Sequence, residues 1–386
     1  MKFSVNKSTF VNMLTPTMGT VAGKNLITAI EGVLIETLED GRIRLSTYDM
    51  DKGVRAIFTP TSIEEEGRFI INAQRLYQTV KLLPDGELTL EVNERLNCII
   101  SCGKSSFSMF ATRGEDFPNL PDLFSENGFE ISASKLKNII GKVSHSISAQ
   151  DMRVMFRGAF FKIKNNEIEV VSCDNFTLSK CKAICDITTA NNGNDDIDFS
   201  FIIPGPALNE LVKILPSNED LKCTIFITRK HAIVICDDIV FFTRTIDSEF
   251  IDYNKILPKN NNIIVNVDRE RFLSGLERAN LIAEEKVQGN GRSYVKLKIE
   301  NNIMFITSSS VNGKVTDEME CVHEGEDIEI AFNCRYLINS VRVADGDEIM
   351  LKFKSFSDAI TIEGVEEDEE YDYFYMILPL KMNDIK

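Results

Sequence analysis

The stretch FEISASKLKNIIGKV, Phe129–Val143, joins a short run of alternating residues to an amphipathic segment. Phe129 and Ile131 alternate with polar residues, which is typical of a strand with one buried face. Ser132 is a residue type that caps helix N-termini. After it, the apolar residues recur at helical spacing: Leu136, Ile139, Ile140 and Val143. The stretch therefore predicts a strand that leads directly into a helix.

The same pattern returns five times along the chain. The further copies are FSVNKSTFVNML from Phe3, FIINAQRLYQTVKLL from Phe69, FIIPGPALNELVKIL from Phe201, IVNVDRERFLSGL from Ile264 and IAFNCRYLINSV from Ile330. Successive copies start 60 to 72 residues apart. A fixed period of this kind indicates a repeat architecture.

Alternating strands with turn signals follow each predicted helix. FFKIKNNEIEVVS turns at Asn165-Asn166, and KLKIENNIMFITS turns at Asn301-Asn302. The repeated unit is therefore β-α-β-β-β, and the fold class is α+β. An apolar stretch ending in Leu-Pro closes every second copy, at Asn119–Pro121, Ile256–Pro258 and Ile377–Pro379. We therefore predict three domains, each a doubled unit: 1–125, 126–259 and 260–386.

Composition bounds the cellular setting of the chain. The N-terminus MKFSVNKSTF lacks an apolar signal core, and no apolar run is long enough to span a membrane, so we expect a cytoplasmic protein. The nine cysteines are odd in number and form no C-x-x-C pair. Small buried thiols in a reducing compartment are the favoured interpretation, and a zinc site is the lesser alternative.

Charge is distributed unevenly between the predicted helices and the rest. The chain has a net charge of −16, which by itself argues against binding to nucleic acid. Yet the six helical windows carry twelve basic and only four acidic residues. Glu favours helices as well as Lys and Arg do, so helix propensity does not explain the bias. The segregation predicts that the helices share one surface that faces a polyanion.

With this repeat and this charge distribution, the chain resembles the bacterial DNA polymerase III β subunits, the replicative sliding clamps. The resemblance rests on the order of several short motifs over the whole length. They are MKFSVNKSTF, Val21-Ala-Gly-Lys24, Phe107-Ser-Met-Phe110, Phe117-Pro-Asn-Leu120, Gln150 before RGAFF, and Tyr375-Met-Ile-Leu-Pro-Leu380. It implies a three-domain processivity fold, with two chains in a closed ring and helices lining the hole.

The resemblance also implies that the ring encircles double-stranded DNA without reading its sequence. Such a ring needs diffuse cationic contacts with phosphates and no tight docking. Lys24 and Gln150 match family positions near the hole. The other candidates are the helix cations Lys7, Arg75, Lys81, Lys135, Lys137, Lys142, Lys213, Arg269, Arg278, Arg335 and Arg342.

The chain joint implied by the resemblance pairs the first domain of one chain with the third domain of another. The matching positions are Lys104, Phe107 and Met109, facing Leu281 and Ile282. Alternation in SSFSMFATR fits an ordinary core strand equally well, so both readings of Phe107 and Met109 stay open.

The family's other working part is an apolar pocket for short linear peptides of the replicative polymerase α subunit, the clamp loader, other polymerases and repair proteins. Here the pattern departs: the family commonly has Asp-Gly-His-Arg-Leu where this chain has Asp174-Asn-Phe-Thr-Leu178. The peptide preference should therefore differ. The matching positions are Phe156, Cys173, Asn175, Phe176, Thr177, Leu178, Ile251, Lys255, Ile256, Ala359, Met376, Leu378, Pro379 and Leu380.

Catalytic motifs are weak in this sequence. Gly103-Lys-Ser105 resembles the end of a P-loop but lies in a predicted strand, and Asp237-Asp238 in VICDDIVFF reads better as a hairpin turn than as a metal site. We expect no catalytic activity, no metal and no cofactor. The alternative function is a divergent clamp paralogue that acts as a peptide-binding scaffold for repair or specialised partners.

Overall fold

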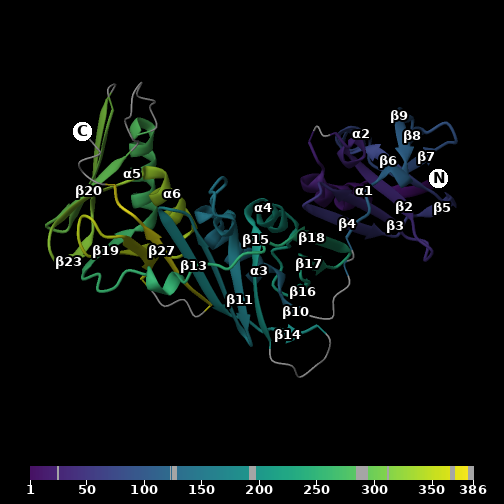
Figure 1. Ribbon diagram of the computed structural model, residues 1–386. Helices are drawn as coiled ribbons and strands as arrows, with labels where there is room; N and C mark the ends of the chain where they lie inside the picture. Colours follow the sequence, from purple (N-terminus) through teal and green to yellow (C-terminus); the bar gives the residue numbers. More distant parts are fainter. Residues whose placement is uncertain are drawn as a thin grey trace. The chain divides into compact units, whose positions relative to one another are not determined.

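The computed structural model describes residues 1–23, 26–121, 123, 128–190, 197–283, 294–310, 313–365 and 370–380. These fall into two compact units (Figure 1). The first comprises Met1–Lys137, Asp186–Ile197 and Pro206–Thr245, and the second comprises Asn138–Cys185, Asp198–Gly205 and Ile246–Lys386. The units follow the sheets and not the order of the chain, so the expected domain boundaries stay predictions.

All six strand–helix copies are confirmed. In each one a strand leads into a helix within a residue. The pairs are β1 (Lys2–Asn6) with α1 (Lys7–Leu14), β6 (Arg68–Asn72) with α2 (Ala73–Leu82), β10 (Gly128–Ser132) with α3 (Ala133–Val143), β15 (Asp198–Pro204) with α4 (Gly205–Ile214), β19 (Ile263–Asp268) with α5 (Arg269–Ala283), and β24 (Ile328–Phe332) with α6 (Cys334–Val343).

Side-chain caps fix the points where strands turn into helices. The Asn72 side-chain oxygen accepts the N–H of Arg75 at 3.0 Å, and the Asp268 carboxylate accepts the N–H of Arg271 at 2.7 Å. Each bond satisfies one of the N–H groups that a helix start leaves without an intrahelical partner. Ser132, predicted as a cap, accepts the N–H three residues ahead at 3.5 Å.

Three longer strands follow each helix, as the repeat predicts. They are β2 (Gly32–Thr37), β3 (Ile43–Tyr48) and β4 (Lys52–Phe58); β7 (Glu87–Val92), β8 (Asn97–Cys102) and β9 (Ser105–Arg113); β11 (Gly158–Lys164), β12 (Glu167–Cys173) and β13 (Thr177–Ile184); β16 (Lys222–Ile227), β17 (His231–Cys236) and β18 (Ile239–Arg244); β20 (Val295–Glu300), β21 (Ile303–Ser309) and β22 (Lys314–Glu320); and β25 (Glu348–Phe353), β26 (Ile360–Gly364) and β27 (Tyr371–Ile377).

Three short strands were not anticipated from the sequence. These are β5 (Ser62–Glu65), β14 (Thr188–Thr189) and β23 (Val322–Glu324), one in every odd copy. Each pairs with the leading strand of its own copy, namely β1, β10 or β19. They are only two to four residues long, which is why their sequence pattern is too short to recognise.

The leading strands are exchanged between the two copies of each doubled unit. β1 pairs with β7 and β6 pairs with β2; β10 pairs with β16 and β15 with β11; β19 pairs with β25 and β24 with β20. The same reciprocal exchange therefore occurs three times. It confirms that the copies associate in pairs, as the spacing of the Leu-Pro closures predicts.

Third strands then join neighbouring pairs into larger sheets. In the first unit β4 pairs with β18, giving the strand order β14-β10-β16-β17-β18-β4-β3-β2-β6-β9-β8-β7-β1-β5. In the second unit β13 pairs with β27, giving β15-β11-β12-β13-β27-β26-β25-β19-β23, beside a four-stranded sheet β22-β21-β20-β24.

The helices bury their apolar faces against these sheets. In the first unit α1 and α2 pack on each other, and Phe10 of α1 forms an aromatic group with Phe3 and Phe58, whose ring centroids lie 5.8 to 6.3 Å apart. All three rings are buried. Aromatic packing of this kind adds about 1 kcal/mol per pair beyond area burial.

A polar network lies beneath the end of α3 in the second unit. His145 Nε2 lies 3.0 Å from the Ser179 hydroxyl oxygen and 3.2 Å from that of Ser340, and its ring meets Tyr375 edge-on at 5.1 Å. Burial lowers the pKa of His145 to about 4, because the charged imidazolium loses its hydration there.

The depressed pKa of His145 predicts a pH-dependent stability. Its unfolded pKa is 6.5, so between pH 6.5 and about 4 the unfolded chain binds a proton that the folded chain excludes. Stability is therefore fully present above pH 6.5 and falls below it, by about 1 kcal/mol at pH 5.5 relative to pH 7. Urea unfolding of the second unit at the two pH values measures the loss.

The matched control is His145→Gln, which retains a hydrogen-bonding side chain without titrating in this range. The pH-dependent part of the loss should vanish in this variant. An equal loss in His145→Gln and in the wild type would show that other groups govern it.

Candidate functional site

The second unit contains an apolar cluster built from six buried side chains: Phe156, Val171, Cys173, Leu178, Tyr253 and Met376. Partly buried residues surround it: Met155, Phe160, Phe250, Ile251, Leu257, Ala359 and Phe374. Of the predicted pocket residues, Phe156, Cys173, Leu178 and Met376 lie in this apolar cluster, while Ile251 and Ala359 lie at its border. The sequence interpretation missed the other seven.

Strand pairing brings the apolar cluster together. Leu178 of β13 lies opposite Cys173 of β12 on one side and opposite Met376 of β27 on the other. Residues directly opposite each other point to the same face of a sheet. The apolar cluster therefore spans the line along which β13 and β27 join two doubled units.

A tight turn carries the residues that depart from the family pattern. The Asp174 carboxylate accepts the N–H groups of Phe176 and Thr177, both at 2.6 Å. The Phe176 ring stacks on Tyr336 of α6, with centroids 5.9 Å apart and planes 21° apart, and its side chain is 49% exposed. The aromatic side chain thus forms a half-exposed shelf beside the apolar cluster.

Arg153 supplies a cation that the Asp174–Leu178 segment lacks. Its guanidinium lies 4.3 Å from the ring centroid of Phe156 and bonds to Asp151 at 3.1 Å and to the side chain of Asn175. These bonds hold the pKa of Asp151 at about 2, well below its ordinary value. The sequence interpretation did not single out Arg153, because the Asn175 side chain that it meets lies 22 residues further along the chain.

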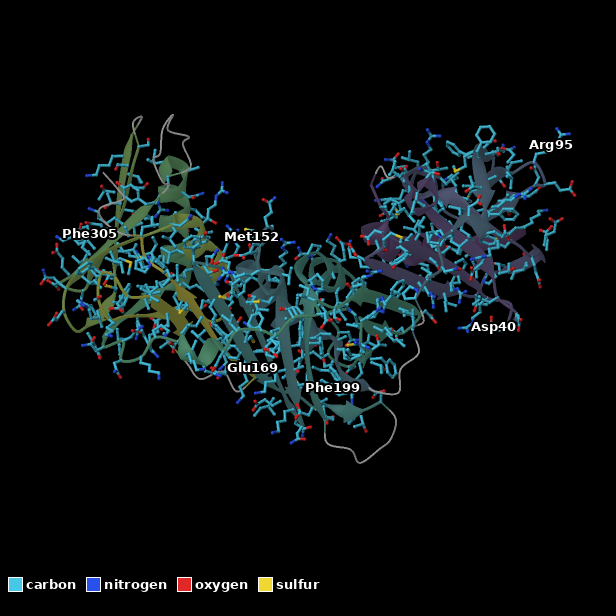
Figure 2. All side chains as sticks on the ribbon, viewed as in Figure 1. Asp40, Arg95, Met152, Glu169, Phe199 and Phe305 are labelled. Carbon is cyan, nitrogen blue, oxygen red and sulfur yellow. The ribbon has the colours of Figure 1, made fainter. Side chains whose placement is uncertain are left out.

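The chain after β27 forms one wall of this region. The Leu378 N–H donates to the Phe176 carbonyl at 2.8 Å, and the Leu380 N–H donates to the Ala331 carbonyl at 2.8 Å. Leu378 is 40% exposed, whereas Pro379 and Leu380 are half-buried. Met152, which precedes Arg153 in the sequence and is labelled in Figure 2, is almost fully exposed.

Three predicted pocket residues do not contribute buried apolar side chains. Lys255 and Ile256 are exposed around the short helix Tyr253–Lys255, and Lys255 pairs with Asp252 at 2.9 Å. Thr177 is buried, and its hydroxyl has no hydrogen-bond partner among the described residues. None of the three belongs to the apolar cluster or to the residues packed against it.

The predicted DNA-facing cations of the first unit fall into two groups. Arg75, Lys81 and Lys213 are exposed, and Lys213 pairs with Glu210 at 2.8 Å. Lys7, Lys135 and Lys137 are half-buried. The Lys7 ammonium donates to the Leu83 carbonyl at 2.5 Å, and the Lys137 ammonium donates to the Leu215 carbonyl at 3.0 Å. Lys7 and Lys137 thus stabilise helix ends.

In the second unit, Arg278, Arg335 and Arg342 are exposed, and so is Gln150. Arg342 bonds to Glu277 at 2.9 Å, Arg278 bonds to Asp317 at 2.6 Å, and the half-buried Arg269 donates to the Gly346 carbonyl at 2.8 Å. Lys24 lies outside the described residues.

Lys142 is buried and does not face a helix surface open to DNA. Its ammonium bonds to Asp345 and lies 4.5 Å from the Tyr373 ring centroid and 5.3 Å from that of Tyr371. The structure gives it a role inside the second unit, because a buried cation must be paired. Helical position alone did not distinguish it from exposed lysines.

The residues predicted at the chain joint lie at open positions of their own units. Strand β9 pairs with β8 along Ser105–Phe110 and meets β6 only from Ala111 onward, so its outer edge is open among the described residues. Phe107 is 42% exposed, whereas Met109 packs against the core. Leu281 is exposed and Ile282 half-buried at the end of α5.

Within the described residues, no group of three or more His, Cys, Asp or Glu side chains is placed to hold a metal ion. All nine cysteines are buried free thiols, and burial raises the pKa of Cys98 to about 12, so this thiol stays protonated. Gly103-Lys-Ser105 forms a hairpin turn between β8 and β9, and Asp237-Asp238 forms one between β17 and β18. Within the described chain, no helix is long and apolar enough to cross a bilayer.

Comparison with known proteins covers nearly the whole chain. Residues 1–121, 130–252 and 254–381 match the N-terminal, central and C-terminal domains of the DNA polymerase III β subunit. The β sliding clamp of Bacillus subtilis is 27% identical over 365 residues, which are 92% of this chain and 93% of that protein. The β sliding clamp of Staphylococcus epidermidis is 24% identical over 99% of both chains.

Solved structures agree with these matches. The sliding clamp of Bacillus subtilis superposes with a TM-score of 0.88 at 25% identity over 99% of both chains. The β subunit of Thermotoga maritima shares the fold with a TM-score of 0.86, at 24% identity over 99% of both chains. With all three of its domains matched in order, the chain belongs to the family of DNA polymerase III β subunits, the sliding clamps.

Proposed function

We propose that this chain works as a ring of two copies that encircles duplex DNA and holds partner proteins in a groove built on the apolar cluster. By family the chain is a DNA sliding clamp, a processivity factor of DNA replication without catalytic chemistry of its own. The assignments of surfaces and residues that follow are part of the proposal, as are its cytoplasmic location and the domain boundaries 1–125, 126–259 and 260–386.

The observation that carries the ring is the pairing of the third strands. Four of the six pair across doubled units, β4 with β18 and β13 with β27. The other two, β9 and β22, each have an open edge among the described residues. An open edge is a template for a further strand. Pairing β9 of one chain with β22 of another, twice, uses both edges and closes a ring.

The exposed helix cations support the DNA-facing role. Arg75, Lys81 and Lys213 in the first unit, and Arg278, Arg335 and Arg342 in the second, all lie on helices. Scattered cations attract phosphates without fixing a register, which suits a ring that must slide. Lys7, Lys137 and Lys142 stabilise the fold, and they contribute to DNA binding only through the electrostatic potential of the whole protein.

The groove at the β13–β27 joint supports partner binding. A cluster of buried apolar side chains bordered by half-exposed Phe176, Leu378 and Ile256 offers anchor positions for an extended peptide. Methionine in the wall adapts to several ligands. We assign this groove to short linear segments of the replicative polymerase, the clamp loader and repair proteins.

A second candidate function rests on the Phe176–Tyr336 stack. An aromatic shelf where the family commonly has histidine changes the chemistry at the mouth of the groove. This favours, as the alternative, a paralogue that serves specialised partners as a scaffold. The two functions differ in whether the ring is loaded topologically onto DNA.

Loading onto circular DNA separates these two functions. After a clamp loader has placed it on nicked plasmid, the chain should be retained on the circular DNA even at high salt, because the link is topological. Linearising the plasmid should release it, as measured by gel filtration of DNA-bound protein. Retention after linearisation would contradict the ring.

The strand edge gives a prediction about the chain joint. Phe107→Asp should weaken dimerisation by about tenfold or more, because it removes apolar area and places a charge at the joint. Analytical ultracentrifugation measures the change. Phe356→Asp is the control, since Phe356 is 64% exposed and lies far along the chain from both open edges. Equal effects of both variants would contradict the assignment of this edge.

The groove gives a prediction about partner affinity. Leu378→Ala should weaken binding of a polymerase-derived peptide by roughly tenfold, since it deletes a half-exposed leucine from the wall. Fluorescence polarisation measures the affinity, and ultracentrifugation should show an unchanged dimer. Ile184→Ala, which truncates a 69% exposed side chain at the other end of β13, is the control. Loss of the dimer in Leu378→Ala would instead indicate a structural role.

A further inference from the structure

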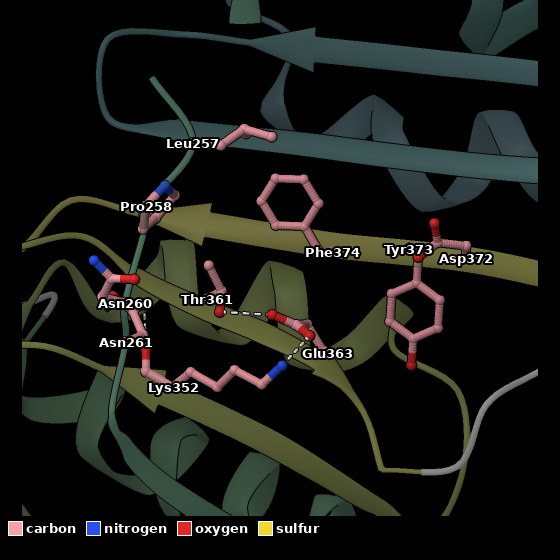
Figure 3. Close-up of a pocket in the computed structure, with 10 residues that line it drawn as sticks. All are labelled: Leu257, Pro258, Asn260, Asn261, Lys352, Thr361, Glu363, Asp372, Tyr373 and Phe374. Atoms are coloured by element: carbon pink, nitrogen blue, oxygen red, sulfur yellow. Dashed lines mark hydrogen bonds and ion pairs between the residues drawn. The ribbon is translucent and has the colours of Figure 1, made fainter. Parts of the chain in front are cut away.

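A cavity of about 400 Å³ lies in the second unit beside the apolar cluster (Figure 3). Its floor is formed by strands β25, β26 and β27, and the chain at 257–261 crosses one side of it. The polar lining includes Asn261, Lys352, Glu363 and Asp372.

The cavity is continuous with the apolar cluster. Leu257 and Phe374 line the cavity and also pack against the apolar cluster. Phe374 and Met376 are two residues apart on β27, and therefore lie on the same face of the sheet. A peptide that follows β27 away from Met376 thus passes directly over the cavity.

The cavity offers hydrogen-bond acceptors and has too few donors. The Glu363 carboxylate accepts from the Lys352 ammonium at 2.5 Å and from the Thr361 hydroxyl at 2.8 Å. Asp372 is exposed, and Lys182 of β13 lies directly opposite it, with its ammonium paired to Glu167 at 2.7 Å. Two carboxylates face one ammonium, so the lining carries a net negative charge.

Asn261 adds a further acceptor. Its amide nitrogen donates to the Lys352 carbonyl at 3.1 Å. Its side-chain oxygen is buried and has no hydrogen-bond partner among the described residues. A buried acceptor without a donor destabilises the fold, and a ligand that supplies the donor removes this cost.

These features match a guanidinium group. Arginine presents five N–H donors in a planar fork and pairs with carboxylates through two bonds at once. Lysine offers a single point charge and suits several spread acceptors less well. Along β27, Asp372 lies four positions before Met376, a separation of about 13 Å, which equals four steps along an extended peptide.

We propose that this cavity is a second subsite of the partner-binding groove, which takes an arginine side chain about four residues away from the apolar anchor of an extended partner peptide. The proposal rests on the proposed function of the groove. It assigns the outer charged part of the same sheet face to peptide specificity, whereas the apolar cluster supplies the anchor.

The test uses synthetic peptides and the full-length dimeric chain. Each peptide carries a Leu-Phe anchor, with arginine four positions before it or four positions after it. In the matched peptides citrulline replaces arginine, which retains the shape and removes the charge. Fluorescence polarisation at 150 mM salt should give about tenfold tighter binding for the arginine peptide on one of the two flanks.

Variants of the chain locate the effect. Asp372→Asn should reduce the preference for arginine over citrulline to about twofold or less, while citrulline peptides bind as before. Asp327→Asn is the control, because Asp327 is an exposed acid of the same unit that does not line the cavity. Leu378→Ala should weaken arginine and citrulline peptides equally.

The outcomes distinguish a failure of the groove assignment from a failure of the arginine subsite. If no anchor peptide binds, the groove assignment itself fails. If the anchor binds and arginine has no advantage on either flank, the groove stands and the subsite is overturned. A preference for arginine that Asp372→Asn and Asp327→Asn reduce equally also overturns the subsite, because it reflects only the acidic charge of the whole chain.

Discussion

The exchange of leading strands between paired copies is the constraint on which the rest of this structure depends. Each leading strand runs straight into a helix, and it finds its hydrogen-bond partner in the first strand after the helix of the other copy. In a single β-α-β-β-β copy, the leading strand and the first strand after the helix would therefore each have an unpaired edge. Backbone N–H and C=O groups require partners, so the copies are stable only in pairs.

The same requirement places the apolar cluster. Once copies are paired, the third strands are left at the outer edges, and β13 satisfies its edge by pairing with β27. Side chains that were surface residues of separate sheets then lie opposite each other, as Leu178 and Met376 do. The apolar cluster is thus a consequence of joining two sheets, and no additional helix or strand is needed to form it.

Much of the fold follows from sequence patterns because the helices and caps are local. Asn72 and Asp268 act through bonds that span three residues, and such bonds can be recognised in a linear sequence. The exchange of strands, the short strand β14 and the burial of Lys142 depend on contacts between distant residues. Lys142 looks like any helical lysine until Asp345 is placed beside it.

The candidate site shows the same division. The resemblance identified Leu178 and Met376, because those positions carry a recognisable motif. It gave no sign of Met155 or Phe374, which enter the cluster border through packing alone. Arg153 was missed for another reason: its partners Asp151 and Asn175 lie two and 22 residues away, so only the folded turn shows that they share one network.

In the DNA-facing role proposed for them, the exposed cations would bind the duplex and still let the clamp move. Lys213, Arg278 and Arg342 each have an acidic partner on their own unit, at Glu210, Asp317 and Glu277. Exposed pairs of this kind contribute less than about 1 kcal/mol, so a phosphate can compete with the carboxylate for the cation. As a phosphate leaves, the carboxylate takes its place, which keeps the free energy nearly level along the duplex. A surface of unpaired cations would hold each phosphate more tightly, and sliding would then require breaking those contacts at every step.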